Sequence, residues 1–181
     1  MATAIVEQDE DTGGNSGSMF EARPDLYEGI FAMRASMMAH RQLPHRLIEL
    51  VRLRIAYRNQ CRPCMSMRYG DAVDDGVTEA LVCELEKPLE SKGLSEAEKL
   101  AVLFADTFAS NHLAVDARMK ADLARHFSQG EIAELALWAA SFVGFGRVGA
   151  IFDGGEALPV GALEAQGDLA PWRVAEPIVQ R

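Results

Sequence analysis

Apolar residues recur at three- and four-residue spacings along most of the chain, which is the period of an amphipathic helix. From about Pro24 this spacing predicts a first helix through Leu26, Ile30, Phe31, Met33, Met37 and Met38. A second helix is expected to open at Pro44 and to carry Leu47, Ile48, Leu50, Val51, Leu53 and Ile55. Because this second stretch is apolar on most sides, we expect it to be buried.

The pattern remains helical downstream. A third helix is expected from Cys61 to about Asp75, stopped by Gly76, followed by a short one over 77–84. Two capping boxes, at 95–98 and 128–131, predict the starts of two more helices, with a short helix over 116–127 between them. The last helix should run through Ile151 and end at 154–155. No alternating strand pattern is visible, so the predicted fold class is all-α.

Composition divides the chain into three parts. Residues 1–20 are acidic and rich in Gly and Ser, which predicts a flexible tail. Residues 21–155 form the predicted helical domain, and residues 156–181, with three prolines, an extended tail that wraps another surface. Two helices that are apolar on most sides, near 47–55 and 135–151, exceed what one small domain needs. We therefore expect a homo-oligomer: a dimer, trimer or hexamer.

Charge narrows the possible partners. The net charge of −9 repels phosphate backbones, so nucleic acid is not an expected partner. No basic start followed by an apolar stretch marks a signal peptide, and the uncharged run 135–146 is shorter than the ~20 residues that span a bilayer. We expect a cytoplasmic protein that does not enter the membrane. Three cysteines are too few, and odd in number, for a secreted disulfide framework.

The candidate chemistry lies in Cys61-Arg62-Pro63-Cys64. Residues three apart on a helix share a face, and the free N–H groups of a helix start favour an anion such as a thiolate. Arg62 and Arg68 would add positive charge. The alternatives are two packed cysteines or half of a zinc site, but no second C-x-x-C and no nearby histidine complete such a site. No His follows Cys64 directly, which excludes c-type haem attachment. We expect neither metal nor cofactor, and we expect Cys83 simply to pack.

A carboxylate inside the apolar second helix is the other candidate. Glu49 lies twelve residues before Cys61, and a buried carboxylate is costly unless it is paired. Glu49 is either a base or proton-relay group, or the partner of Arg52 on the next turn. The sequence leaves both roles open. It also leaves open whether His112 or His126 approaches the site.

Together these residues resemble a known signature. Glu49, eleven intervening residues and Cys61-x-x-Cys64, with the step at 76–78 and the helix start at 127–128, resemble the alkylhydroperoxidase D-like branch of the carboxymuconolactone decarboxylase family. The likeness covers roughly residues 24–152. It implies an all-α fold, trimers or hexamers, and peroxide reduction. It also implies that Cys64 becomes a sulfenic acid, that Cys61 donates a proton and resolves it, and that Glu49 serves a proton relay. The helix dipole alone would favour Cys61 as the nucleophile.

The chain departs from this signature at one position. Arg68 stands where the family has a histidine, four residues after the second cysteine. Arginine stays protonated, so Arg68 can hold a thiolate but cannot shuttle a proton. The alternative is a structural or substrate-carboxylate contact.

The leading hypothesis is a thiol-disulfide oxidoreductase that reduces hydroperoxides through Cys64 and Cys61, with Glu49 and Arg68 in support and an external dithiol as reductant. A second hypothesis is a redox sensor or thiol-switched assembly, which is oxidised once without turnover. A third is an unrelated small-molecule enzyme, whose activity would survive the loss of both cysteines.

Overall fold

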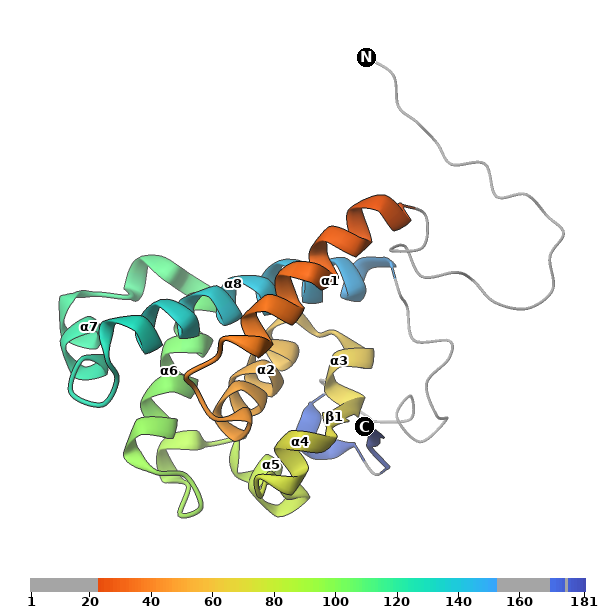
Figure 1. The fold of residues 1–181 in the computed structure, drawn as a ribbon. Coiled ribbons are helices and arrows are strands. Elements are labelled where there is room, and N and C mark those ends of the chain that lie inside the picture. Colours follow the sequence, from red (N-terminus) through yellow and green to blue (C-terminus); the bar gives the residue numbers. More distant parts are fainter. Residues whose placement is uncertain (1–22, 153–169, 175) are drawn as a thin grey trace, which may run out of the picture.

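The computed structural model describes residues 23–152, 170–174 and 176–181, and these are mostly helical (Figure 1). The helices are α1 (Pro24–Ala39), α2 (His45–Asn59), α3 (Arg62–Ser66), α4 (Gly70–Asp74), α5 (Glu79–Glu84), α6 (Glu96–Asn111), α7 (Ala117–Leu123) and α8 (Gln129–Phe152). Two strands, β1 (Met67–Tyr69) and β2 (Ile178–Gln180), and three 3-10 turns, Pro88–Glu90, His112–Ala114 and Pro171–Arg173, complete the described elements. The predicted tail 1–20 and the predicted helix stop at 154–155 lie outside the described residues.

Helix α2 is the centre of the domain, as its apolar sequence predicts. It packs against both α6 and α8. One side contributes Leu47, Val51 and Ile55 to a core shared with Phe104 and Trp138. The other side contributes Leu50 and Leu53 to a smaller core. Their partners there include Val77, Val82 and Leu85, which follow the cysteines in the sequence. Burial on both sides holds this helix rigidly, and the cysteines come directly after its end.

Both predicted capping boxes are present. The Ser95 hydroxyl accepts from the Glu98 N–H, and the Glu98 carboxylate accepts from the Ser95 N–H. Ser128 and Glu131 make the same reciprocal pair at the start of α8. Each box satisfies two backbone donors that a helix start leaves unpaired, which explains why these two helix starts are readable from sequence.

The predicted third helix over 61–75 is wrong as a single element. Helix α3 ends at Ser66, Met67 is extended with ψ of 146°, and a new helix begins at Gly70. The interruption is strand β1, which pairs in parallel with β2 in the register Met67 with Ile178. A strand of three residues has too few positions to show alternation, and its partner lies near the end of the chain. The predicted stop is present, since Gly76 has φ of +86°, a conformation that favours glycine.

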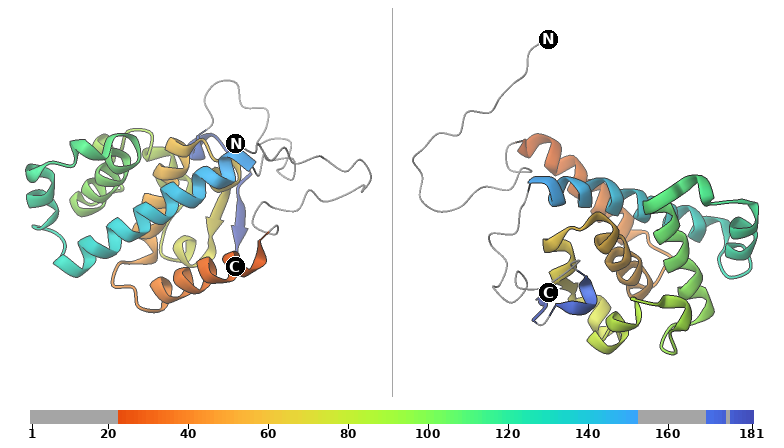
Figure 2. Two further views of the ribbon diagram at one scale, coloured as in Figure 1. Left: turned by 90° about the horizontal axis from the view of Figure 1, so that it is seen from above. Right: turned by 180° about the vertical axis from the view of Figure 1, so that it is seen from behind.

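The described C-terminal residues pack on their own domain. In Figure 2, β2 lies beside β1. Ahead of β2, the Trp172 ring lies 4.8 Å from the ring of Tyr57 on α2, and Pro171 is buried. These contacts bring the end of the chain to the segment that follows the cysteines.

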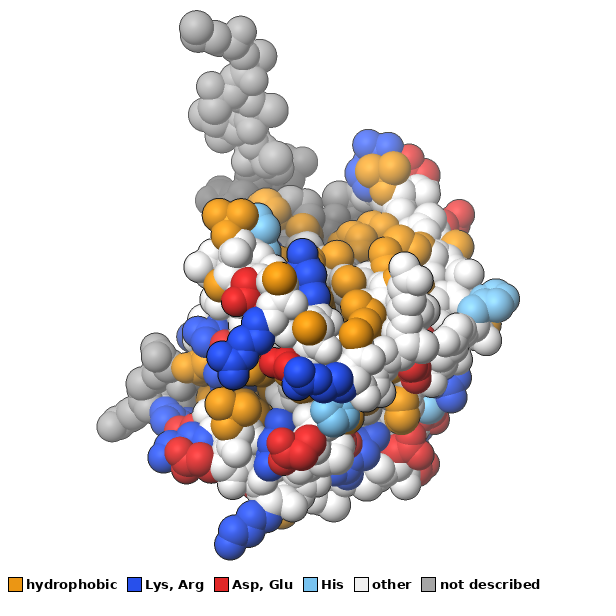
Figure 3. All heavy atoms as spheres, turned by 90° about the vertical axis from the view of Figure 1, so that its left-hand side faces the viewer, with side chains coloured by type: hydrophobic (Ala, Val, Ile, Leu, Met, Phe, Trp, Pro, Cys, Tyr) orange, Lys and Arg blue, Asp and Glu red, His pale blue; other side chains and the backbone are white. Residues whose placement is uncertain are grey.

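Helices α1 and α8 are less covered than the rest. Helix α1 has no buried residue, although Met37 and Met38 pack against the core. Helix α8 is 24 residues long and apolar enough to cross a membrane by length and composition, a test that core helices of soluble proteins also pass; 28% of its most apolar window is buried. The shorter run considered from sequence alone missed this length. Hydrophobic side chains gather on the upper part of the face in Figure 3, while charges of both signs occupy the lower part.

Candidate redox site

The end of α2 sets the position of the cysteine pair. Gln60 closes the helix in the left-handed conformation, with φ of 52°, and the N–H groups of Gln60 and Cys61 both reach back to the Ala56 carbonyl. This is a Schellman-type stop, and it turns the chain sharply into α3. Asn59 fastens the same corner to α8 by donating to the Phe142 carbonyl at 2.9 Å. Gly146 permits this approach, because a Cβ there would lie 2.5 Å from the Asn59 amide nitrogen.

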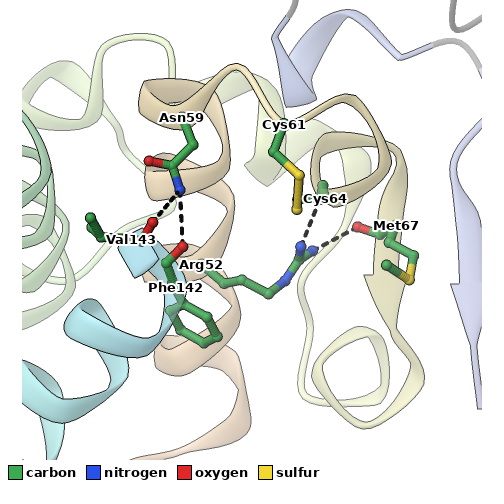
Figure 4. The surroundings of a disulfide bond; sticks show 7 residues. All are labelled: Arg52, Asn59, Cys61, Cys64, Met67, Phe142 and Val143. Carbon is green, nitrogen blue, oxygen red and sulfur yellow. Dashed lines mark hydrogen bonds between the residues drawn. A yellow bond between two sulfur atoms is a disulfide. The ribbon is translucent and has the colours of Figure 1, made fainter. Parts of the chain in front are cut away.

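The two cysteines are joined as a disulfide, with an S–S distance of 2.04 Å (Figure 4). Cys61 precedes the first residue of α3 and is fully buried, whereas Cys64 is half-buried. Helix α3 has only five residues, so the helix-dipole argument for a Cys61 thiolate is weak. Of the two sulfurs, the one on Cys64 belongs to the more accessible residue.

The carboxylate of Glu49 forms an ion pair with Arg52, one of the two roles that the sequence leaves open. Its two oxygens accept from Arg52 at 2.6 and 2.7 Å, and both side chains are buried. Nη1 of Arg52 also donates to the Cys64 carbonyl at 2.6 Å, and Nη2 donates to the Met67 carbonyl at 2.7 Å (Figure 4). Glu49 also accepts from the Tyr69 N–H at 3.3 Å. A buried pair on α2 therefore holds the backbone at the second cysteine and at two residues that follow it, Met67 and Tyr69.

Arg52 stays charged in this setting. Burial alone would lower its pKa, but the adjacent Glu49 carboxylate outweighs burial and raises the pKa of Arg52 above its usual value. The result is a fixed cation hydrogen-bonded to the backbone of Cys64.

Arg68 does not take the place expected for it beside the thiols. Its guanidinium binds the Glu79 carboxylate at 2.8 and 3.0 Å and the carbonyls of Met65, Met67 and Pro171 at 2.7–2.9 Å. In an unbroken helix, positions 61, 64 and 68 would share one face. The extended residues of β1 turn Arg68 off that face, toward α5 and the C-terminal segment. Arg62 is exposed.

A cavity of about 410 Å³ opens beside the disulfide. Cys61, Pro63 and Cys64 form one part of its wall, and α1, α2 and α8 form most of the rest. Five aromatic side chains contribute to this lining: Tyr27, Phe31, Tyr69, Phe142 and Phe145. Two arginines, Arg34 and Arg52, supply its positive charge. The dithiol therefore faces a space large enough for an organic molecule.

Sequence reasoning missed Arg34. It is a single cation within the apolar spacing of the first helix, the same kind of signal that singled out Glu49. It misplaced Cys83 too, because that thiol is exposed rather than packed. The residue lies on the outer side of α5, whose inner side carries Leu81 and Val82. His112 and His126 do not line the cavity.

The comparison with family models agrees with this site. Residues 24–107, which run from α1 through the cysteine pair and most of α6, match the model of the carboxymuconolactone decarboxylase family. This part of the chain is similar to that family. The match includes Glu49, Arg52 and both cysteines of the site.

The chain is also similar to an uncharacterized protein of Mycobacterium tuberculosis, found in strains CDC 1551 and H37Rv. The identity is 39% over 89 residues. The aligned part is 48% of this chain and 31% of the relative, so the chain spans about a third of the length of the curated relatives it matches.

The fold is also similar to a crystal structure from Agrobacterium tumefaciens. That protein is of unknown function and is named as a candidate antioxidant defence protein, AhpD. The TM-score is 0.65 with 20% identity, and the match covers 77% of this chain and 96% of the other. At this identity the likeness establishes a shared AhpD-like helical fold.

Proposed function

We propose that this chain is a dithiol peroxidase of the alkylhydroperoxidase D-like kind, which reduces organic hydroperoxides with Cys64 and Cys61. One observation carries the proposal: the pair lies in the wall of a 410 Å³ cavity, and its second cysteine is held by a charged arginine. The family match and the fold of the AhpD candidate are consistent with antioxidant chemistry.

The first step is attack by the Cys64 thiolate on the terminal oxygen of a hydroperoxide, ROOH, which is the oxygen that carries the hydrogen. The O–O bond breaks, Cys64 becomes a sulfenic acid, and the alkoxide takes the Cys61 proton to leave as ROH. Cys64 suits the role of nucleophile because it is more accessible than the fully buried Cys61. Arg52 donates to the Cys64 carbonyl and so fixes the backbone that carries this cysteine.

The second step closes the disulfide. The Cys61 thiolate attacks the sulfenic sulfur, and the hydroxide that leaves takes a proton from solvent to become water. An external dithiol then reduces the disulfide by exchange and is itself oxidised to a disulfide. The balance is one hydroperoxide and one dithiol consumed for one alcohol, one water and one new disulfide. A reducing compartment such as the cytoplasm supplies such dithiols.

In this proposal Glu49 acts through Arg52. Both of its oxygens hold the guanidinium, so its contribution is to fix the cation that holds the Cys64 carbonyl. Glu49 is therefore a positioning residue in this account, and the proton for the departing alkoxide comes from the neighbouring thiol.

Steady-state turnover tests the proposal. Cumene hydroperoxide and dithiothreitol would be supplied to wild type, Cys64→Ser and Cys61→Ser, all in a Cys83→Ser background that removes the exposed third thiol. We expect one cumyl alcohol per dithiothreitol oxidised over many turnovers, and loss of turnover in both variants. Oxidation that stops after one equivalent would contradict the enzyme and support the redox sensor. Turnover that survives the loss of both cysteines would support an unrelated enzyme.

We also propose that the chain is a homo-oligomer. Exposed apolar side chains lie on α1 and α8, among them Leu26, Phe31, Leu137 and Ile151. In an oligomer, a second copy would cover these apolar side chains and remove them from water, which is favourable. Light scattering at micromolar concentration should give a multiple of the 19.8 kDa chain mass, and a monomer mass would contradict this proposal.

A further inference from the structure

We propose that the cavity beside the cysteine pair binds an apolar organic carboxylate, and that Arg34 is the residue that holds its acid group. In terms of the proposed function, on which this part rests, the substrate class is then hydroperoxides of apolar carboxylic acids. Binding of the acid itself does not depend on turnover.

The cavity is larger than the smallest peroxide requires. Its volume is about 410 Å³, within the range of pockets that hold small organic ligands, whereas a water-sized molecule occupies only about 30 Å³. Hydrogen peroxide would leave most of the aromatic lining without a partner. A ligand with a hydrocarbon body would instead remove its own apolar surface from water against Phe31, Phe142 and Phe145.

Among the described residues, Arg34 is the cation of this lining that has no carboxylate partner. Its one hydrogen bond among the described residues is from Nη2 to the Tyr69 hydroxyl, at 2.5 Å. Its guanidinium also lies 5.1 Å from the centre of the Tyr69 ring. Within the described parts of the chain no acidic oxygen comes within salt-bridge distance of it. A guanidinium has five N–H donors in a fork that matches a carboxylate, so most of its capacity remains open.

Arg52 cannot serve the same purpose. Glu49 already neutralises its charge with two hydrogen bonds, and the Cys64 and Met67 carbonyls take two more of its five N–H donors. The two guanidinium groups lie over the same ring, with Arg52 5.0 Å from the centre of Tyr69. The cavity thus has one cation committed to the protein and one available to a ligand. In a chain of net charge −9, an available cation in an apolar lining selects for an anion.

Calorimetric titration of the disulfide form with decanoate and with decanol tests the inference. Wild type should bind decanoate about tenfold or more tightly than decanol, since a charge-assisted pair adds to equal apolar burial. Arg34→Met should lower decanoate affinity about tenfold or more and abolish the preference. Arg41→Met is the matched control: it removes the same charge from an exposed residue that does not line the cavity, so the preference should remain.

Equal affinity for decanoate and decanol in wild type would overturn the inference. Equal losses in the two arginine variants would overturn it as well, because they would show a general effect of charge. Arg34→Lys should recover part of the preference, since it restores the charge without the fork. A protein that binds decanoate through Arg34 yet consumes no peroxide would contradict the peroxidase and leave this inference standing. A protein that consumes cumene hydroperoxide but ignores decanoate would do the reverse.

Discussion

Arg52 precedes the second cysteine in the sequence and Arg68 follows it, and each is a buried arginine paired with a glutamate. They differ in the exposure of that partner: the Glu49 side chain is 2% exposed, whereas the Glu79 side chain is 46% exposed. They also differ in what they hold. Arg52 binds the Cys64 and Met67 carbonyls, and Arg68 binds the Met65, Met67 and Pro171 carbonyls.

This difference separates an arginine of the site from an arginine of the scaffold. Arg52 lies on the buried helix α2, and its guanidinium donates to the carbonyl oxygen of Cys64 itself. Arg68 sits on strand β1 and fastens the C-terminal segment to the domain. Nearness in sequence therefore does not tell which arginine contacts the second cysteine. Arg68 is only four residues from Cys64 and Arg52 is twelve, yet Arg52 is the one that binds the Cys64 carbonyl.

The largest expected effect follows from removing Arg52. Arg52→Met would leave the Glu49 carboxylate buried without a cation, and breaking a buried pair in this way costs about 3–5 kcal/mol. Chemical denaturation of the reduced protein would measure the loss of unfolding free energy. The double variant Glu49→Met/Arg52→Met is the control, because it removes both charges together. It should be more stable than Arg52→Met, and a double variant as unstable as the single one would contradict a pairing role.

A smaller effect is expected from Arg68→Met. Glu79 can turn to solvent when its partner is lost, so the main cost is the Met65 and Pro171 carbonyls left without a donor, about 1–3 kcal/mol. Amide hydrogen exchange should rise selectively in 176–181, because the C-terminal strand loses one of its attachments. Unchanged exchange there, with a destabilisation as large as that of Arg52→Met, would remove the distinction between the two arginines.

The smallest expected effect is on the thiols themselves. If Arg68 acted on the dithiol, Arg68→His and Arg68→Ala would shift the pH profile of thiol alkylation, and the histidine would speed peroxide turnover. Since the guanidinium is committed to Glu79 and to backbone carbonyls, we expect wild type and both variants to share one alkylation profile in the Cys83→Ser background. A pH profile of alkylation displaced by half a pH unit or more in either variant would contradict this expectation and show that Arg68 acts on the thiols.

Local signals made much of this fold predictable. Each capping box, at Ser95 and at Ser128, is complete within four residues and can be recognised without knowing distant contacts. The apolar run of α2 likewise predicts burial without knowledge of the partners that cover it. The cysteine pair and its glutamate are recognisable because their spacing is fixed by one helix and one turn. The ion pair between Glu49 and Arg52 was one of the two roles predicted for Glu49. It was predictable because residues three apart on a helix are neighbours.

Distant contacts were not predictable. Strand β1 forms because residues 178–180 pair with it, and the sequence of Met67–Tyr69 does not indicate this partner. The orientation of Arg68 depends on this strand and was missed with it. Arg34 reaches the cavity from α1, so its relevance emerges only when that helix is placed over the cysteines. The exposed position of Cys83 similarly depends on which side of the short α5 faces the core.

In the proposed reaction, Cys64 receives the peroxide oxygen and Cys61 resolves the sulfenic acid. The most direct measurement uses the Cys61→Ser/Cys83→Ser variant, in which a sulfenic acid on Cys64 has no thiol in its own chain to attack it. Treatment with cumene hydroperoxide and a sulfenic-acid-trapping dione, followed by peptide mass spectrometry, should place one adduct on Cys64. Absence of an adduct from this variant, with an adduct on Cys61 in the matched Cys64→Ser/Cys83→Ser variant, would contradict the account.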